Sequence, residues 1–384
     1  MKLKFTNICL IILLVPIVNG ITRKELVDYA VRQYNRVTQT VKTGVQYPSI
    51  GNPWSAQWEV TPPVDNQWTA GFYPGILWHL YNYTKDDHWK QLATKATDAM
   101  YNDQYNTWQH DIGFMIMCSY GNAYEFTKNP DYPKIIVNAA NHLAKRFNPK
   151  IGCTRSWDSG HDGQFLVIVD NVMNLELLFE GWKHSGNETL YDMAVSHINV
   201  TLKEHLRSDY SHYHVVSFNE SNGRVIRKFT AMGYADWSCW SQGQAWLVAG
   251  LTIAYRYTKA DYILKAAQGV SNYFIDHLAD DGIAHWDFSV PHDPQHRYIP
   301  RDTAAASIAA NGLIELYSYT KNEKYLNAFN KIMNSLNTSK YKADGNRDYK
   351  IPALLVNGST DAHLHDSALI FGDYYYVKAF RYVL

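Results

Sequence analysis

The sequence predicts an all-α protein, an (α/α)6 barrel in which six helical hairpins form an inner and an outer ring. Apolar residues recur at spacings of three and four along most of the chain, which is typical of packed helices. Alternate apolar runs, such as GILWHLY and AASIAANGLI, are richer in small residues, as a shielded inner ring requires. A corner motif separates many of these runs: an aromatic residue, then Thr or Ser with polar turn residues, then a second aromatic. Its five copies begin at Tyr81, Tyr124, Trp182, Tyr255 and Tyr317.

The predicted helices follow one another in pairs, and each corner motif is expected to join the two helices of one hairpin. Asp and Asn residues of the motif are expected to cap the second helix, because their short side chains accept hydrogen bonds from exposed backbone N–H groups. The twelve predicted helices cover residues 24–38, 69–83, 87–104, 111–127, 131–147, 170–185, 188–206, 241–258, 260–279, 302–319, 322–338 and 366–382.

The longest connections follow the second helix of a hairpin. The corner Thr and Ser residues are separated by intervals of 43 to 73 residues, which is too variable for a flat solenoid. In a closed ring such connections gather on one face, where we expect the functional site. Alternating residues and a Ser-Asn-Gly turn predict a β-hairpin over residues 212–229. The predicted loops cover residues 45–68, 148–169, 207–240, 280–301 and 339–365.

The charge balance excludes several classes of partner. Lys plus Arg equals Asp plus Glu at 36 each, so no long-range field attracts a nucleic-acid backbone or an anionic membrane. An acidic ligand must therefore be held by local groups. We expect no cofactor and no metal, since the pair His212 and His214 lacks a third ligand of clear spacing. The oligomeric state stays open.

Residues 1–20 are expected to be a secretory signal peptide, because a basic start precedes an apolar run that ends at Gly20. The run is too short to span a bilayer, which takes about 20 residues. We therefore expect a secreted glycoprotein in which residues 21–384 form a single catalytic domain. Six glycosylation sequons agree with this route; they are Asn82, Asn187, Asn199, Asn219, Asn337 and Asn357.

Three cysteines follow the signal peptide, too few for a disulfide framework. Cys118 is expected to be a buried free thiol. Whether Cys153 and Cys239 pair is open from the sequence alone.

Two aspartates stand where a loop enters a predicted inner helix: Asp111 in HDIGFMIM and Asp170 in IVDNVMNLELL. Either one alone is well explained as a helix N-cap. Two carboxylates that open onto the same face instead favour acid and base catalysis, which requires groups in different environments. Asp302, at the start of RDTAAASIAANG, is expected to be a cap only.

Aromatic and imidazole side chains surround these positions. Trp68, Trp157, Trp240 and Trp246 lie in or beside the loops, where their rings could stack on sugars, although core packing explains any one of them equally well. His214 could bind substrate or orient a proton donor; the alternative is an ordinary surface histidine.

Six motifs in order resemble the unsaturated glucuronyl hydrolases of glycoside hydrolase family 88. The resemblance extends from about Asp65 to Ala379, nearly the whole mature chain. The motifs are DNQWTAGFYPG, HDIGF, VDNVMNLELL, GYADWSCWSQGQAW, RDTAAASIAANGLIEL and GDYYYVKAF.

This resemblance implies a six-hairpin barrel that removes a 4,5-unsaturated uronic acid from the non-reducing end of oligosaccharides left by polysaccharide lyases. It also implies that Asp170 is the general acid and base, and that Asp111 is the second active-site carboxylate. The chemistry implied is hydration of the C4=C5 enol ether. The positions that match substrate contacts are Trp68, His110, Trp157, His214, Trp240, Gln242 and Trp246.

The chain departs from the family pattern at two of its positions. Met232 stands where the family commonly has Gln, and Gln242 stands where it commonly has Arg, a fixed cation suited to an anionic sugar. Arg227, Lys228 or Arg301 could supply the missing charge. Two alternatives follow from these departures and from the shared fold: an unsaturated rhamnogalacturonyl hydrolase acting on pectic fragments, and an inactive carbohydrate-binding barrel.

Overall fold

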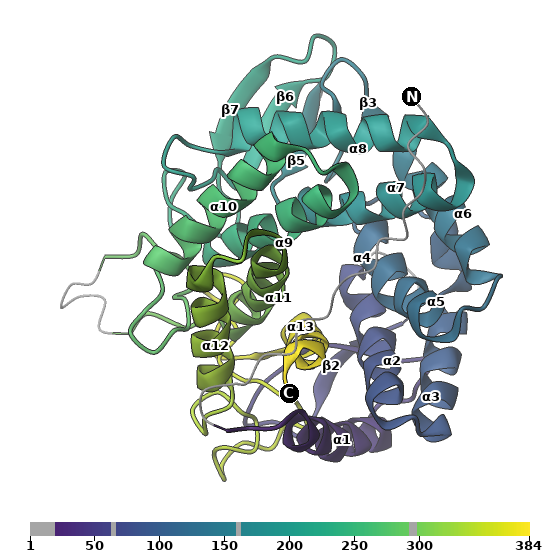
Figure 1. The fold of residues 1–384 in the computed structure, drawn as a ribbon, viewed down its shortest axis with the longest axis vertical. Coiled ribbons are helices and arrows are strands. Elements are labelled where there is room, and N and C mark those ends of the chain that lie inside the picture. Colours follow the sequence, from purple (N-terminus) through teal and green to yellow (C-terminus); the bar gives the residue numbers. More distant parts are fainter. Residues whose placement is uncertain (1–19, 63–66, 159–162, 292–297) are drawn as a thin grey trace.

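The computed structural model describes residues 20–62, 67–158, 163–291 and 298–384, and it arranges their helices as a ring (Figure 1). The inner helices are α2 (Phe72–Thr84), the continuous series α4 (Ile112–Ile116), η3 (Met117–Gly121) and α5 (Asn122–Thr127), then α7 (Asn171–Ser185), α9 (Ser241–Thr258), α11 (Thr303–Thr320) and α13 (Ile370–Ala379). The outer helices are α1 (Arg23–Thr40), α3 (Asp87–Asp98), α6 (Tyr132–Ala144), α8 (Glu188–Val200), α10 (Asp261–Asp276) and α12 (Glu323–Leu336). The predicted barrel is confirmed.

Neighbouring inner helices pack side by side. α2 contacts α13, and the series continues through α11, α9 and α7 to α4. The ring closes because η3 and α5, which continue α4, contact α2 again. The inner helices are buried on nearly all sides, whereas each outer helix buries one apolar stripe. The two ends of the described chain meet, because Arg23 donates its backbone N–H to the Leu384 carbonyl at 2.8 Å.

The corner motif forms the same structure at each of its copies. The Thr or Ser hydroxyl donates to the carbonyl four residues back, as Thr84 does to Leu80 at 2.8 Å. The next residue takes a left-handed backbone conformation that ends the inner helix. Asp86 and Asn187 cap the following outer helices as predicted, but Asp131 makes no side-chain cap within the described residues. The residues in the left-handed conformation are Lys85, Lys128, Gly186, Lys259 and Lys321.

Two predicted helices are shorter than expected. The helix expected over 87–104 ends at Asp98 and is followed by the 3-10 turn η2 (Tyr101–Tyr105). The helix expected over 366–382 begins only at Ile370, because Ala368–Leu369 forms strand β8 and the last residues form the 3-10 turn η5 (Phe380–Tyr382). A 3-10 turn, η1 (Trp68–Gly71), precedes α2. The helix expected over 188–206 is α8 continued by the π-helical segment η4 (Thr201–His205).

Small antiparallel sheets cover the loop end of the barrel. The predicted hairpin is confirmed as β6 (Val215–Asn219) and β7 (Val225–Phe229), and β5 (Gln164–Ile168) joins it as a third strand that was not predicted. β1 (Tyr47–Gly51) pairs with β2 (Trp58–Thr61) and β8, and β3 (Phe147–Asn148) pairs with β4 (Cys153–Thr154). β5 leads directly to Asp170, so the sheet fixes the entry to α7.

The described cysteines, Cys118, Cys153 and Cys239, are all buried and free, so Cys153 and Cys239 do not pair. Across the part of the chain that the structure describes, no helix is both long and apolar enough to cross a membrane. The predicted signal peptide falls on residues 1–19, outside the described residues, and Gly20.

Candidate active site

The two aspartates lie at the starts of neighbouring inner helices, Asp111 before α4 and Asp170 before α7, at the loop end of the barrel. Within the described residues, neither side chain makes a capping hydrogen bond to its helix. The capping interpretation is therefore wrong for both side chains. Both carboxyl groups face other side chains of the site instead.

The carboxyl group of Asp170 is held in an environment that favours its protonated form. The residue is only 8% exposed, and its Oδ2 atom has no hydrogen-bond partner among the described residues. Burial raises the pKa of Asp170 to about 8, with a smaller contribution from the nearby Asp111 and an opposing one from its own backbone N–H. Asp170 therefore carries a proton at neutral pH.

His214 faces Asp170 from strand β6. Its Nε2 atom lies 3.6 Å from Oδ2 of Asp170, and its Nδ1 atom accepts the backbone N–H of Ala231 at 3.2 Å. Burial holds the pKa of His214 well below its usual range, so the ring is neutral and its one proton is on Nε2, toward the carboxyl group. The surface-histidine interpretation is wrong, because His214 is 3% exposed.

Asn174 connects the two aspartate-bearing helices, and sequence reasoning missed it. Its Nδ2 atom donates to Oδ1 of Asp111 at 2.9 Å and lies 3.2 Å from Nδ1 of His110, while its Oδ1 accepts the N–H of Phe114 at 2.8 Å. The close approach needs Gly113, since a Cβ there would lie 2.4 Å from Asn174 Oδ1. The available signal was its position one turn after Asp170 in VDNVMNLELL.

His110 contributes a second buried imidazole beside Asp111. Its Nε2 atom lies 3.4 Å from Oδ2 of Asp111. Burial lowers the pKa of His110; Asp111 opposes this shift and the charge of Arg146 adds to it.

The four tryptophans divide into two groups. The rings of Trp157 and Trp240 flank His214, with centroids 6.1 and 4.7 Å from the imidazole. Trp68 and Trp246 instead pack against Phe114, at 5.7 and 5.0 Å, in an aromatic layer that spans the barrel interior. Trp246 is 1% exposed, while Trp157 is half-buried.

Gln242 and Met232, where the chain departs from the family pattern, also lie near the site. The Gln242 amide donates to Oδ2 of Asp302 at 3.2 Å, and Met232 packs in a small cluster with Trp240. Asp302 is confirmed as a cap, since its Oδ1 accepts the N–H groups of Ala304 and Ala305. Burial raises its pKa to about 7.

The cations considered as substitutes for the family arginine have partners of their own. Lys228 lies 3.2 Å from Glu204, and Arg301 lies 3.4 Å from Asp281. Arg227 is exposed, with its guanidinium over the ring of Phe229. In the described ranges, no group of three His, Cys, Asp or Glu side chains is arranged to hold a metal ion, and His212 contacts Gln244 and Cys239.

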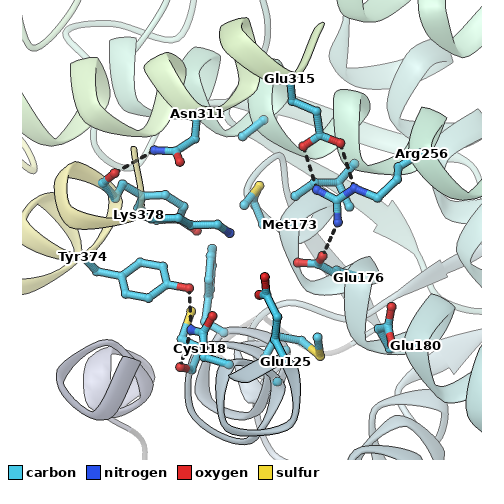
Figure 2. A pocket seen from close by; sticks show the side chains of 18 of the residues that line it. Cys118, Glu125, Met173, Glu176, Glu180, Arg256, Asn311, Glu315, Tyr374 and Lys378 are labelled. Carbon is cyan, nitrogen blue, oxygen red and sulfur yellow. Dashed lines mark hydrogen bonds and ion pairs between the residues drawn. The ribbon is translucent and has the colours of Figure 1, made fainter. Parts of the chain in front are cut away.

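A cavity of about 410 Å³ runs along the inner helices, from Gly113, Phe114 and Met173 near the starts of α4 and α7 to the charged groups at the corner end of the barrel (Figure 2). Arg256 binds Glu315 with two hydrogen bonds there and reaches Glu176 with a third, linking α9 to α11 and α7. Neither Asp111 nor Asp170 lines this cavity. The two aspartates therefore lie outside this cavity, toward the loop end.

Comparison with known proteins places this site in a family. The model of Glycosyl Hydrolase Family 88 matches residues 24–280. An unsaturated glucuronyl hydrolase of Formosa agariphila is 35% identical, over 91% of this chain and 89% of its own. An unsaturated chondroitin disaccharide hydrolase of Streptococcus pneumoniae is 29% identical, over 93% of this chain and 91% of its own.

Solved structures agree with the sequence relatives. An unsaturated glucuronyl hydrolase specific for heparin superposes with a TM-score of 0.87 at 36% identity, covering 94% of this chain and 96% of its own. An unsaturated glucuronyl hydrolase from a Bacillus species has a TM-score of 0.83 at 27% identity, with 93% and 96% covered. The protein is a glycosidic hydrolase that belongs to glycosyl hydrolase family 88.

Proposed function

We propose that the protein releases a 4,5-unsaturated uronic acid from the non-reducing end of oligosaccharides, with Asp170 as the group that moves the proton. The observation that carries this proposal is the buried carboxyl group of Asp170, whose Oδ2 atom has no hydrogen-bond partner among the described residues and whose pKa is raised to about 8 by burial and by the nearby Asp111. Relatives named as unsaturated glucuronyl and chondroitin disaccharide hydrolases support the substrate class. So does a similar Streptococcus agalactiae structure, 25% identical, that is complexed with dGlcA-GalNAc6S.

The substrate's chemistry explains why such a carboxyl group is needed. C4 and C5 share a double bond, and the ring oxygen on C5 donates electrons that make C4 basic. Asp170 gives its proton to C4, and positive charge develops at C5 and the ring oxygen. Water then adds to C5 and returns a proton to Asp170. The resulting hemiketal opens and releases the alcohol, so the acid is regenerated without attack at the anomeric carbon.

The neighbours of Asp170 fit the two charge states it passes through. Before the transfer, burial and the Asp111 carboxylate keep the proton on Asp170. After the transfer, the Nε2–H of His214 faces the new carboxylate and stabilises it. Asp111, held by Asn174, places negative charge near the positive sugar ring.

The direct test follows the ultraviolet absorbance of the conjugated double bond. We expect the wild type to consume the absorbance of an unsaturated uronyl disaccharide and Asp170→Asn to abolish this while still binding the sugar. Asp373→Asn is a matched control, because burial also raises the pKa of Asp373 to about 7, yet it accepts from Leu354 and Leu355 away from the site. Near wild-type turnover by Asp170→Asn would refute the assignment.

The substrate class is tested separately. We expect turnover of unsaturated disaccharides from glycosaminoglycans to exceed that of pectic ones, since the named relatives are of the glucuronyl and chondroitin types. The converse product profile would instead favour the rhamnogalacturonyl type of enzyme. If the protein consumes neither class of disaccharide, the result would favour a carbohydrate-binding protein without catalytic activity.

We also propose that the chain is secreted and glycosylated at two of its sequons. Asn187 and Asn199 are exposed, whereas Asn337 and Asn357 donate their amides to the carbonyls of Met333 and Lys340. Mass spectrometry of protein recovered from culture medium should find glycans at Asn187 and Asn199. Recovery only from the cell fraction, without glycans, would contradict the proposal.

A further inference from the structure

Arg146, two residues after the end of outer helix α6, donates to an unusual set of partners. The residue is 8% exposed, and its guanidinium donates to three backbone carbonyls in two separate loop segments. The acceptors are the carbonyls of Thr107 at 2.7 Å from Nη1, Arg155 at 2.9 Å from Nε, and Ser156 at 3.2 Å from Nη2.

Asp158 completes the set. Its two carboxylate oxygens accept from Nη1 at 3.1 Å and from Nη2 at 2.9 Å, so the pair is bidentate. The guanidinium thereby makes five hydrogen bonds and uses every donor it has. A lysine, with one nitrogen on a flexible stem, cannot reproduce this fork.

The two segments that Arg146 holds are those that carry site residues. Thr107 stands three residues before His110 and four before Asp111, and Ser156 immediately precedes Trp157. Arg146 touches neither Asp170 nor His214 through any of these hydrogen bonds. It therefore acts on the site through the backbone of these two segments, and its charge also lowers the pKa of His110.

A second network supports the same segment from the inner side. Asn171, next to Asp170, donates to the carbonyl of Thr154 at 3.0 Å and to the Ser156 hydroxyl at 3.3 Å. The Ser156 hydroxyl in turn accepts the N–H of Ile168 at 3.0 Å. The strand before Trp157 is thus fixed to α7 on one side, and Arg146 fixes it to the Asp111 segment on the other.

We propose that Arg146 is a positioning residue of the active site, which locks the segments 107–111 and 155–158 together so that Asp111 and Trp157 face Asp170. This inference rests on the proposed function. A buried guanidinium is costly to desolvate, so losing any of its acceptors is unfavourable. All five of its hydrogen bonds go to the two loop segments and none to the barrel core, which ties the two segments to each other. A shift of about 1 Å in either segment can reduce turnover by about a hundredfold.

The test compares Arg146→Gln and Arg146→Lys with Arg381→Gln. Arg381 is a matched control, since its side chain is 11% exposed and binds Glu125 at 3.0 Å, at the opposite end of the barrel. We expect Arg146→Gln to lower kcat/KM at least tenfold and to raise KM, with Arg146→Lys falling between it and the wild type. Arg381→Gln is expected to lower the melting temperature with kcat/KM unchanged.

A double-mutant cycle with Trp157→Ala separates positioning from simple structural support. If Arg146 acts through Trp157, Arg146→Gln should cost much less in the Trp157→Ala background than in the wild type. The same cycle with Asp111→Asn tests the other segment, and an equal loss in the wild type and in both variant backgrounds, or wild-type kcat/KM in folded Arg146→Gln, would overturn the inference. Wild-type protein that consumes no unsaturated disaccharide would instead refute the proposed function.

Discussion

At the scale of single residues, the site depends on where protons are held. Asp170 is buried beside Asp111, and its pKa is raised from 3.8 to about 8. Between these values the folded protein binds a proton that the unfolded chain releases. The resulting stabilisation is fully present below the unfolded pKa, falls steadily as the pH rises between the two values, and is lost once the pH has risen through about 8, where the folded group ionises as well.

Asp170→Asn removes this pH dependence, because the amide cannot ionise. We expect the variant to be more stable than the wild type at pH 8, and the difference in the free energy of unfolding to grow by on the order of 3–4 kcal/mol between pH 5 and pH 8. Denaturant unfolding at the two pH values measures it. A constant difference would show that Asp170 ionises normally in the folded protein.

Asp111 should affect both the rate and its pH dependence. Asp111→Asn removes the charge that helps to keep Asp170 protonated, so the fall of kcat/KM at alkaline pH should move to lower pH. The same change should lower kcat by about a hundredfold or more. Rate profiles from pH 5 to pH 9 test both effects, and full activity in the variant would exclude Asp111 from the chemistry.

At the scale of helices and strands, the site is the place where α4 and α7 approach each other most closely. Gly113 lets the two backbones meet, and Asn174 bonds to both the Asp111 side chain and the Phe114 backbone. β5 carries the chain into α7 and pairs with the strand that follows His214. The carboxyl groups are therefore positioned by regular elements rather than by free loops.

Removing the amide that joins α4 to α7 should damage both stability and turnover. We expect Asn174→Ala to destabilise the fold by about 1–3 kcal/mol, because the Phe114 N–H loses its buried acceptor. It should also lower kcat/KM at least tenfold. Asn311→Ala is the control: Asn311 joins α11 to α13 at the Tyr375 carbonyl, so its loss should affect stability but not kcat/KM.

At the scale of the whole molecule, the barrel has two ends with different chemistry. The loop end holds Asp111 and Asp170 with aromatic rings around them, and the corner end holds charged groups paired across the ring. There burial acts to raise the pKa of Glu315, but Arg256 outweighs it and the pKa falls. The aromatic layer that includes Phe114 and Trp246 lies between the carboxylates and the cavity.

Arg256→Met should leave Glu176 and Glu315 without their shared cation. We expect it to cost about 3 kcal/mol of stability, since breaking a largely buried pair exposes the remaining charges to an apolar interior. The double variant Arg256→Met with Glu315→Gln should recover part of that loss. Because the cluster is remote from Asp170, kcat/KM of the folded protein should stay unchanged, and unaltered unfolding of the single variant would contradict this account.

Local patterns along the chain determined the ring of hairpins, its corners, the hairpin over 212–229 and the cap at Asp302. Helical periodicity and capping depend on residues a few positions apart, which the sequence displays directly. The roles proposed for Trp68, His110, Trp157, His214, Trp240, Gln242 and Trp246 as substrate contacts stay predictions.

Only the tertiary structure decided that Asp111 and Asp170 face side chains instead of capping their helices, and that Asn174 and Arg146 make hydrogen bonds to the segment that carries Asp111. It also decided that β5 joins β6, some fifty residues later in the chain. Burial and hydrogen bonds between distant segments depend on groups brought together by folding, and these leave no regular spacing in the sequence.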